Sequence, residues 1–214
     1  MRAIQLAVAC VAVLVATAGQ VQAGIITFES DPIGSKPNGF TSTDSLIVHF
    51  SDSFRSDLIL SNFGSQGDGI SLATFGDDAS ELIIDFDVLV DSLSLSFGND
   101  DPGFSHPGDL AFLTLFNGIV QVGQTSVVLN RNDIMDQTIS FSGPTFNQAR
   151  FAYTDPSGVP INLTEIVDNV QFNEASVAAV PEPSSLALFG IGACMIGIGA
   201  CRRRRREKQQ VTAA

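Results

Sequence analysis

Short apolar stretches separated by glycine, proline, asparagine, aspartate and serine fill the chain between residues 24 and 180. No apolar repeat of helical period extends through this region, whereas several stretches alternate between apolar and polar side chains. In residues 92–97, leucine and phenylalanine alternate with serine, which is typical of a strand with one buried face. The pattern therefore predicts an all-β body.

Twelve strands are expected from these stretches: Ile25–Glu29, Leu46–Phe50, Leu58–Asn62, Ile70–Phe75, Glu81–Phe86, Ser92–Phe97, Leu110–Phe116, Ile119–Val122, Ser126–Leu129, Thr138–Phe141, Ala149–Tyr153 and Glu165–Phe172. The Asn117-Gly118 pair between two of them predicts a hairpin. Ser30–Thr43 and Gly98–Gly108 are the longest expected loops. So many short strands within residues 24–179 predict an antiparallel β-sandwich of the jelly-roll type.

The N-terminus has the three parts of a secretory signal peptide. Met1-Arg2 is a basic start, residues 3–18 are apolar, and Val21-Gln22-Ala23 has the small-x-small pattern of a cleavage site. We expect a signal peptide helix in residues 1–23, removed after Ala23, and one exported domain in residues 24–179. A retained N-terminal anchor is the alternative.

The charge and the cysteine content of the body restrict what it can bind and how it can be stabilised. Residues 24–180 contain four basic and 21 acidic side chains, although the whole chain has a net charge of only -12. Such a domain should repel nucleic acid and attract divalent cations, unless the charge serves solubility alone. No cysteine lies in this region, so the body has no disulfide and needs its core, or a metal, for stability.

The C-terminal segment reads as a membrane-directed tail. Pro181 and Pro183 favour an extended backbone, and residues 186–201 are uncharged and mostly apolar. As a helix they would span about 24 Å, which is short for a bilayer but can be accommodated. A stop-transfer cluster follows at Arg202, Arg203, Arg204, Arg205 and Arg206, which predicts a transmembrane helix over 186–201 and a cytoplasmic tail over 207–214.

This order of parts resembles the PEP-CTERM sorting signal, which is also catalogued as the ice-binding protein C-terminal domain. The resemblance covers residues 180–206 and implies that an exosortase reads the motif in 180–185, namely Val180, Pro181, Glu182 and Pro183. It also implies an exported protein of bacteria that make exopolysaccharide, anchored in the membrane before processing. A plain C-terminal anchor without processing is the alternative.

The ends of the body are similar to those of other PEP-CTERM exported domains and of carbohydrate-binding jelly rolls. That resemblance implies a structural calcium between the first and last strands, with Glu29 and Asp168 as ligands and Asp31 as a third. Solvated carboxylates are the alternative. The clusters Asp77-Asp78 and Asn99-Asp100-Asp101 are rival sites, for which we favour ordinary turn formation.

Motifs of known enzymes are missing from the sequence. His49 and His106 are far apart, and no nucleophile elbow, metalloprotease helix or phosphate loop occurs. We therefore expect a non-enzymatic protein with a structural or adhesive role in the matrix or envelope. A calcium-stabilised carbohydrate-binding module is the alternative, although the chain has no tryptophan and one tyrosine with which to stack sugar rings.

Overall fold

A computed structural model describes residues 23–76 and 78–176, which belong to one compact unit. The predicted signal peptide helix, the sorting motif, the transmembrane helix and the arginine cluster lie outside the described residues, apart from Ala23 at the border. Within the described ranges no helix is both long enough and apolar enough to cross a membrane.

The body is all-β, as predicted, with one short 3-10 turn at Gly64–Gln66. The described strands are β1 (Ala23–Ile26), β2 (Gly34–Lys36), β3 (Phe40–Thr41), β4 (Val48–Asp52), β5 (Leu58–Asn62), β6 (Ile70–Thr74), β7 (Leu82–Gly98), β8 (Leu110–Asn117), β9 (Val120–Val128), β10 (Gln137–Thr154) and β11 (Ile166–Glu174). All their pairings are antiparallel.

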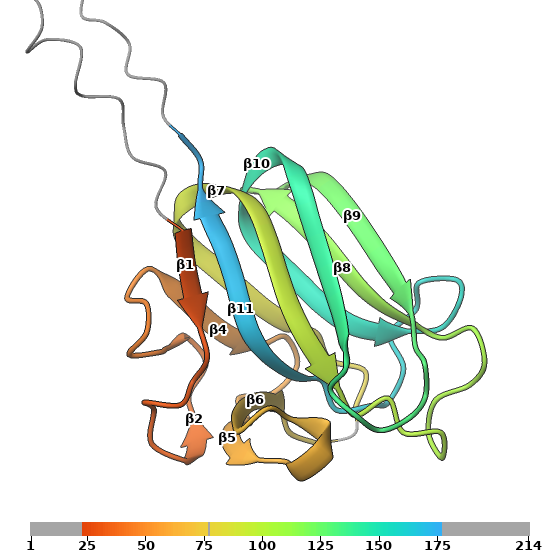
Figure 1. Ribbon diagram of the computed structural model, residues 1–214. Helices are drawn as coiled ribbons and strands as arrows, with labels where there is room; N and C mark the ends of the chain where they lie inside the picture. Colours follow the sequence, from red (N-terminus) through yellow and green to blue (C-terminus); the bar gives the residue numbers. More distant parts are fainter. Residues whose placement is uncertain (1–22, 77, 177–214) are drawn as a thin grey trace, which may run out of the picture. The chain divides into compact units, whose positions relative to one another are not determined.

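Two long strands, β7 and β10, bend and run through both layers of the sandwich (Figure 1). In the first layer, the beginning of β7 lies between β4 and the end of β10, which continues to β8 and β9. In the second layer, the end of β7 lies between β11 and the beginning of β10, and β1 pairs with β11. The layers are therefore connected as one hydrogen-bonded sheet of jelly-roll type.

The bend in β7 explains why the sequence predicted two strands where the structure has one. Leu82, Ile84 and Phe86 are buried in the first layer, but in the second layer the buried positions move to Leu93, Leu95 and Phe97. The switch from even to odd positions coincides with irregular pairing to β10 near Val90. A local irregularity of this kind re-aims side chains without ending the strand.

Two further pairs of predicted strands are also single strands in the structure. The predicted strand pairs 119–122 with 126–129 and 138–141 with 149–153 merge into β9 and β10. Conversely, β2 and β3 lie inside the expected Ser30–Thr43 loop, where two or three paired residues are too few to produce an alternating pattern.

The predicted hairpin joins β8 to β9, with its loop one residue later than the sequence suggested. Asn117 pairs with Val120, which leaves Gly118 and Ile119 as the loop residues. Gly118 has a φ of 58° at the first central position, where a type II′ turn requires glycine. Ile119 is 98% exposed, so it does not start a buried strand.

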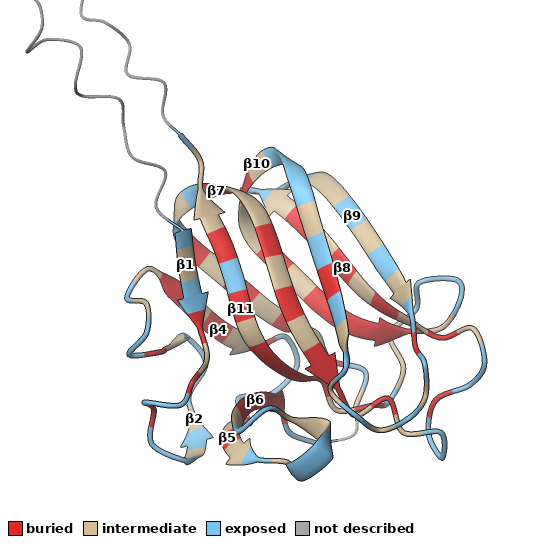
Figure 2. Cartoon of the chain, in the orientation of Figure 1, coloured by how far each residue is buried: buried red, intermediate tan, exposed pale blue. Residues whose placement is uncertain are grey.

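Phenylalanine rings hold the two layers together. The ring of Phe86 lies 5.4 Å from that of Phe172, and Phe97 lies 5.8 Å from Phe151, each pair joining opposite layers. Buried and exposed positions alternate along the strands of both layers (Figure 2). The outer faces of the two layers carry polar side chains together with some exposed apolar ones, such as Ile25, and one of these faces carries a groove.

Candidate binding groove

The structure brings two of the three predicted calcium ligands together and places the third elsewhere. Glu29 Oε1 accepts a hydrogen bond from the Ile70 N–H at 2.9 Å, and Asp168 Oδ2 accepts one from the Ser71 hydroxyl at 2.9 Å. Both carboxylates therefore lie at the start of β6. Asp31 instead accepts the Ser42 hydroxyl at 2.5 Å and the Thr43 N–H at 2.9 Å.

Asp168 is a buried carboxyl group with acidic neighbours. Burial is the main cause that raises its pKa to about 7, and the charges of Asp68 and Glu29 raise it further, against hydrogen bonds from Asn169 and Ser71 that lower it. Even so, within residues 23–76 and 78–176 no three acidic, histidine or cysteine side chains form a group that could hold a metal ion. Calcium stays a prediction.

The rival acidic clusters organise loops. Both oxygens of the buried Asp100 accept backbone N–H groups, from Arg131 and, at 2.8 Å, from Asp133. Asp101 accepts the Gly103 N–H at 2.6 Å, which is an Asx-type turn. Asp78 lies 3.6 Å from Arg55, whereas Asp77 is outside the described residues.

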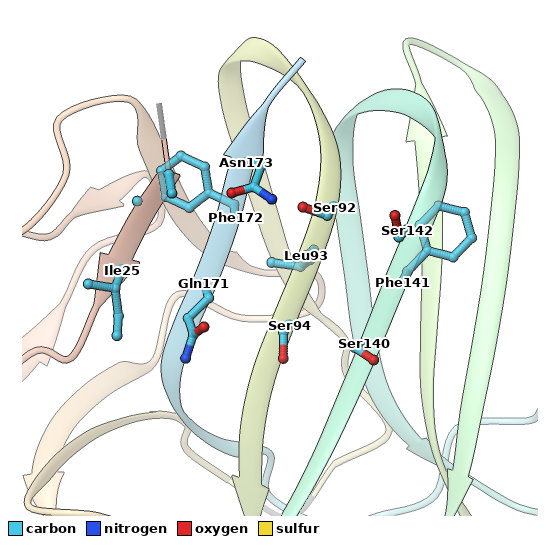
Figure 3. A pocket seen from close by; sticks show the side chains of 12 residues that line it. Ile25, Ser92, Leu93, Ser94, Ser140, Phe141, Ser142, Gln171, Phe172 and Asn173 are labelled. Atoms are coloured by element: carbon cyan, nitrogen blue, oxygen red, sulfur yellow. The ribbon is translucent and has the colours of Figure 1, made fainter. Parts of the chain in front are cut away.

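A groove of about 540 Å³ lies on the outer face of the second layer (Figure 3). It crosses β1, β11, β7 and β10, and none of its lining residues is charged. Seven side chains point out of the sheet into it: Ile25, Ser92, Ser94, Ser140, Ser142, Gln171 and Asn173. We call this site the serine groove.

Strand register aligns these side chains in two rows across the sheet. Gln171 pairs with Ser94, which pairs with Ser140, and Ile25 extends this row on β1. Asn173, Ser92 and Ser142 form the second row in the same way. Adjacent strands are about 4.8 Å apart and successive same-face residues about 6.7 Å apart, so the groove presents a regular lattice of hydroxyl and amide groups.

The polar side chains of the serine groove are not used to hold the protein together. Among the described residues, none of its four serines, Gln171 or Asn173 makes a side-chain hydrogen bond. The outer face of the first layer differs in this respect. There His49 bonds to Thr41 at 2.7 Å and Gln148 to Asp85 at 2.8 Å, and Arg150 pairs with Glu81 at 3.4 Å.

The strand that forms the edge of the groove is fixed by close packing. A side chain at Gly24 would lie 2.3 Å from the ring of Phe172, so glycine is required for β1 to approach β11. The Phe172 ring itself is turned into the core and is 4% exposed. Phe141, the other aromatic residue of the lining, is partly buried against the core, and Ile25, which is 51% exposed, is the large apolar side chain that the groove exposes.

Sequence reasoning identified the serines of residues 92–96 as the polar face of a strand but not as a site. In β10, Ser140 and Ser142 likewise alternate with apolar residues. Ile139, just before them, is buried in the core between the two layers. Two serine-alternating strands are thus a weak signal in the sequence. Their alignment with each other and with β11 is a property of the register alone.

Comparison with known proteins supports the tail assignment directly. A family model described as the PEP-CTERM protein-sorting motif matches residues 179–206. Among curated protein sequences, none matches this chain.

Several solved structures show a remote likeness to the chain. The CBM22-1 xylan-binding domain from Paenibacillus barcinonensis Xyn10C is 13% identical, with a TM-score of 0.41 over 76% of this chain and 99% of its own. The C-terminal family 22 carbohydrate binding module of Clostridium thermocellum Xyn10B is 11% identical, with a TM-score of 0.39 over 73% and 95%. A family 32 module of C. perfringens NanJ is 9% identical, with a TM-score of 0.33 over 72% and 100%.

Proposed function

We propose that this chain is an exported, exosortase-sorted protein whose body binds polysaccharide in the serine groove, which gives it a structural or adhesive role in the extracellular matrix or envelope. The PEP-CTERM motif at 179–206 supports export and sorting. The observation that carries the binding role is the row arrangement of six uncharged polar side chains that have no hydrogen-bond partner among the described residues.

The chemistry of the groove suits a hydroxyl-rich polymer. Serine hydroxyls and side-chain amides both donate and accept hydrogen bonds, as sugar hydroxyls do. The repeat of the rows across four strands matches an extended ligand better than a single small molecule. Polyanionic polysaccharides are disfavoured because 21 acidic side chains against four basic ones give the body a negative field.

The affinity of a single body for such a ligand should be modest. Each net hydrogen bond contributes about 0.5–1.5 kcal/mol, and no exposed ring adds stacking energy in the groove. A role on a surface that displays many copies of the protein would compensate through multivalency.

Removing two groove hydroxyls should weaken binding without affecting the fold. We expect the double variant Ser94→Ala/Ser140→Ala to bind polysaccharide about 5- to 100-fold more weakly than the native protein, as the loss of roughly two hydrogen bonds predicts. Titration calorimetry of the purified protein against a panel of polysaccharides measures this change.

The matched control is Thr114→Ala/Ser126→Ala, which removes two hydroxyls from the other layer. These positions on β8 and β9 also make no side-chain hydrogen bond to the described residues. The control should bind as the native protein does. Equal affinity of the groove variant and the native protein for every ligand would refute the assignment of the groove.

Calcium stabilisation is a second candidate, favoured by the position of Glu29 and Asp168 at the start of β6, where backbone carbonyl oxygens would have to complete the coordination. The donor set consists of oxygens only, which suits calcium, and a cation there would offset the cost of ionising a buried carboxyl group. When bound, calcium would supply positive charge and join the beginning of the chain's body to its last strand. Asp31 is not expected to take part, because Ser42 and Thr43 already engage both its oxygens.

Thermal unfolding tests this candidate. At a calcium concentration about 100 times the dissociation constant, the folded state should gain about 2.7 kcal/mol, which raises the Tm by roughly 5–10 °C. The variant Glu29→Gln/Asp168→Asn should lose this response, whereas Glu81→Gln/Asp87→Asn, on the other layer, should keep it. An identical Tm in calcium and in chelator would exclude the site.

A further inference from the structure

The uncharged serine groove lies close to carboxylates and away from the body's basic residues. Asp168 pairs with Ser96, two residues after Ser94 on β7, so it stands one row, about 6.7 Å, beyond the groove. The exposed carboxylates of Glu29 and Asp68 lie at this end, since Glu29 Oε1 accepts the Ile70 N–H at 2.9 Å and Asp68 Oδ2 accepts the side-chain amide of Asn169, next to Asp168, at 3.3 Å.

None of the four basic residues of the body lines the groove. Arg150 is paired with Glu81 on the other layer, Arg55 with Asp78, and Arg131 with carbonyl oxygens of the 102–105 loop. Lys36 donates to the Pro32 carbonyl at 2.6 Å. A ligand in the groove is therefore exposed to an uncompensated negative potential.

We propose that the ligand of the serine groove is an amino-sugar polymer with free ammonium groups. This inference rests on the proposed polysaccharide-binding function and specifies its substrate class. The groove supplies hydroxyl and amide partners for the sugar hydroxyls, and the surrounding carboxylates supply the counter-charge for ammonium groups along the polymer. An N-acetylated polymer offers the same hydroxyls without the positive charge, so the two forms separate the contributions of shape and charge.

Two properties follow from this assignment. Binding of the amino-sugar polymer weakens as salt screens the exposed carboxylates, whereas binding of the N-acetylated polymer is nearly independent of salt. Calcium bound at Glu29 competes with the ammonium-bearing polymer for the same carboxylate. Both effects depend on the carboxylates around the groove and not on the uncharged side chains that line it.

The experiment compares a β-1,4-linked glucosamine oligomer with its N-acetylated counterpart of equal length, titrated into the purified full-length protein at 20 mM and 500 mM salt. At low salt we expect the glucosamine oligomer to bind roughly tenfold more tightly, as one or two added charge-assisted contacts predict. At high salt the two affinities should converge. Ser94→Ala/Ser140→Ala should weaken both oligomers, since it acts on the shared hydroxyl contacts.

Glu29→Gln/Asp68→Asn should reduce the low-salt preference to about threefold or less, whereas Glu81→Gln/Asp87→Asn, with the same change in net charge on the other layer, should retain it. Equal binding of both oligomers at low salt would overturn the amino-sugar assignment and leave the groove's polysaccharide function intact. Binding of neither, nor of any other polysaccharide, would overturn both. Glucosamine binding that survives the groove variant would show attraction to the acidic surface in general, and would also overturn the proposal.

Discussion

A Glu165→Gln variant is expected to be more stable than the native protein at pH 8, by up to about 4 kcal/mol, and equally stable at pH 4. Glu165 has no solvent exposure and lies just before β11. Its carboxyl group accepts the Tyr153 N–H at 3.3 Å and the hydroxyl of Thr74. Burial is the dominant cause that raises its pKa to about 8, from an ordinary value of 4.5.

The sign of the effect follows from proton linkage. Between pH 4.5 and 8 the folded protein keeps a proton on Glu165 that the unfolded chain has lost, so the free energy of unfolding falls as the pH rises through this window. Asp168, whose pKa is raised to about 7, acts in the same direction. Glutamine is neutral at every pH, so a variant with glutamine at position 165 does not lose the stability that ionisation of Glu165 costs the native protein.

Thermal or denaturant unfolding of both proteins between pH 4 and pH 8 measures the difference. At pH 8 the Tm of the variant should exceed that of the native protein by roughly 10 °C. Glu81→Gln removes a partly exposed carboxylate in an ion pair and should change stability by less than about 1 kcal/mol throughout. A Glu165→Gln protein that is less stable than the native one at pH 8 would show that the ionised carboxylate is a required part of the core.

Replacing Pro181, Glu182 and Pro183 together by alanine is expected to prevent C-terminal processing completely. From the sequence we expect the two prolines to favour an extended backbone, the form that a protease or transpeptidase binds, and Glu182 adds a charge that alanine lacks. The native protein recovered from the envelope should begin at Gly24 and end near Pro181–Ser185. The variant should still contain Arg202–Arg206.

Intact mass spectrometry distinguishes these products. A Glu207→Ala variant, which removes one acidic residue beyond the arginine cluster, should be processed as the native protein is. If the native protein retained Arg202–Arg206, the tail would be a permanent anchor and not a sorting signal. An N-terminus other than Gly24 would contradict cleavage of the signal peptide after Ala23.

Much of the body could be predicted because strand alternation is local. Residues 92–97 show their buried and exposed faces in six positions, and β4, β5, β8 and β11 were expected within a few residues of their bounds. The length of β7 could not be predicted, because the buried parity changes at the bend between the layers. β2 and β3 depend on partners elsewhere in the chain and leave no pattern of their own.

The residues of the candidate calcium site were likewise only partly predictable from the sequence. Glu29 and Asp168 were linked through a resemblance between the ends of the body, and the structure does bring them to one place. Asp31 was named as a third ligand, but its side chain turns to Ser42 and Thr43. Proximity in the sequence cannot show which way a loop carboxylate points.

By itself, the sequence determined that the body is made of strands, that the charge of the body is strongly negative, and that the chain carries a PEP-CTERM sorting motif. Each of these is a matter of composition or of neighbours a few residues apart. Only the tertiary structure decided where binding can occur. The serine groove exists because Ser94, Ser140 and Gln171, far apart in the chain, are placed side by side by antiparallel register, and register depends on which strands pair and where they bend.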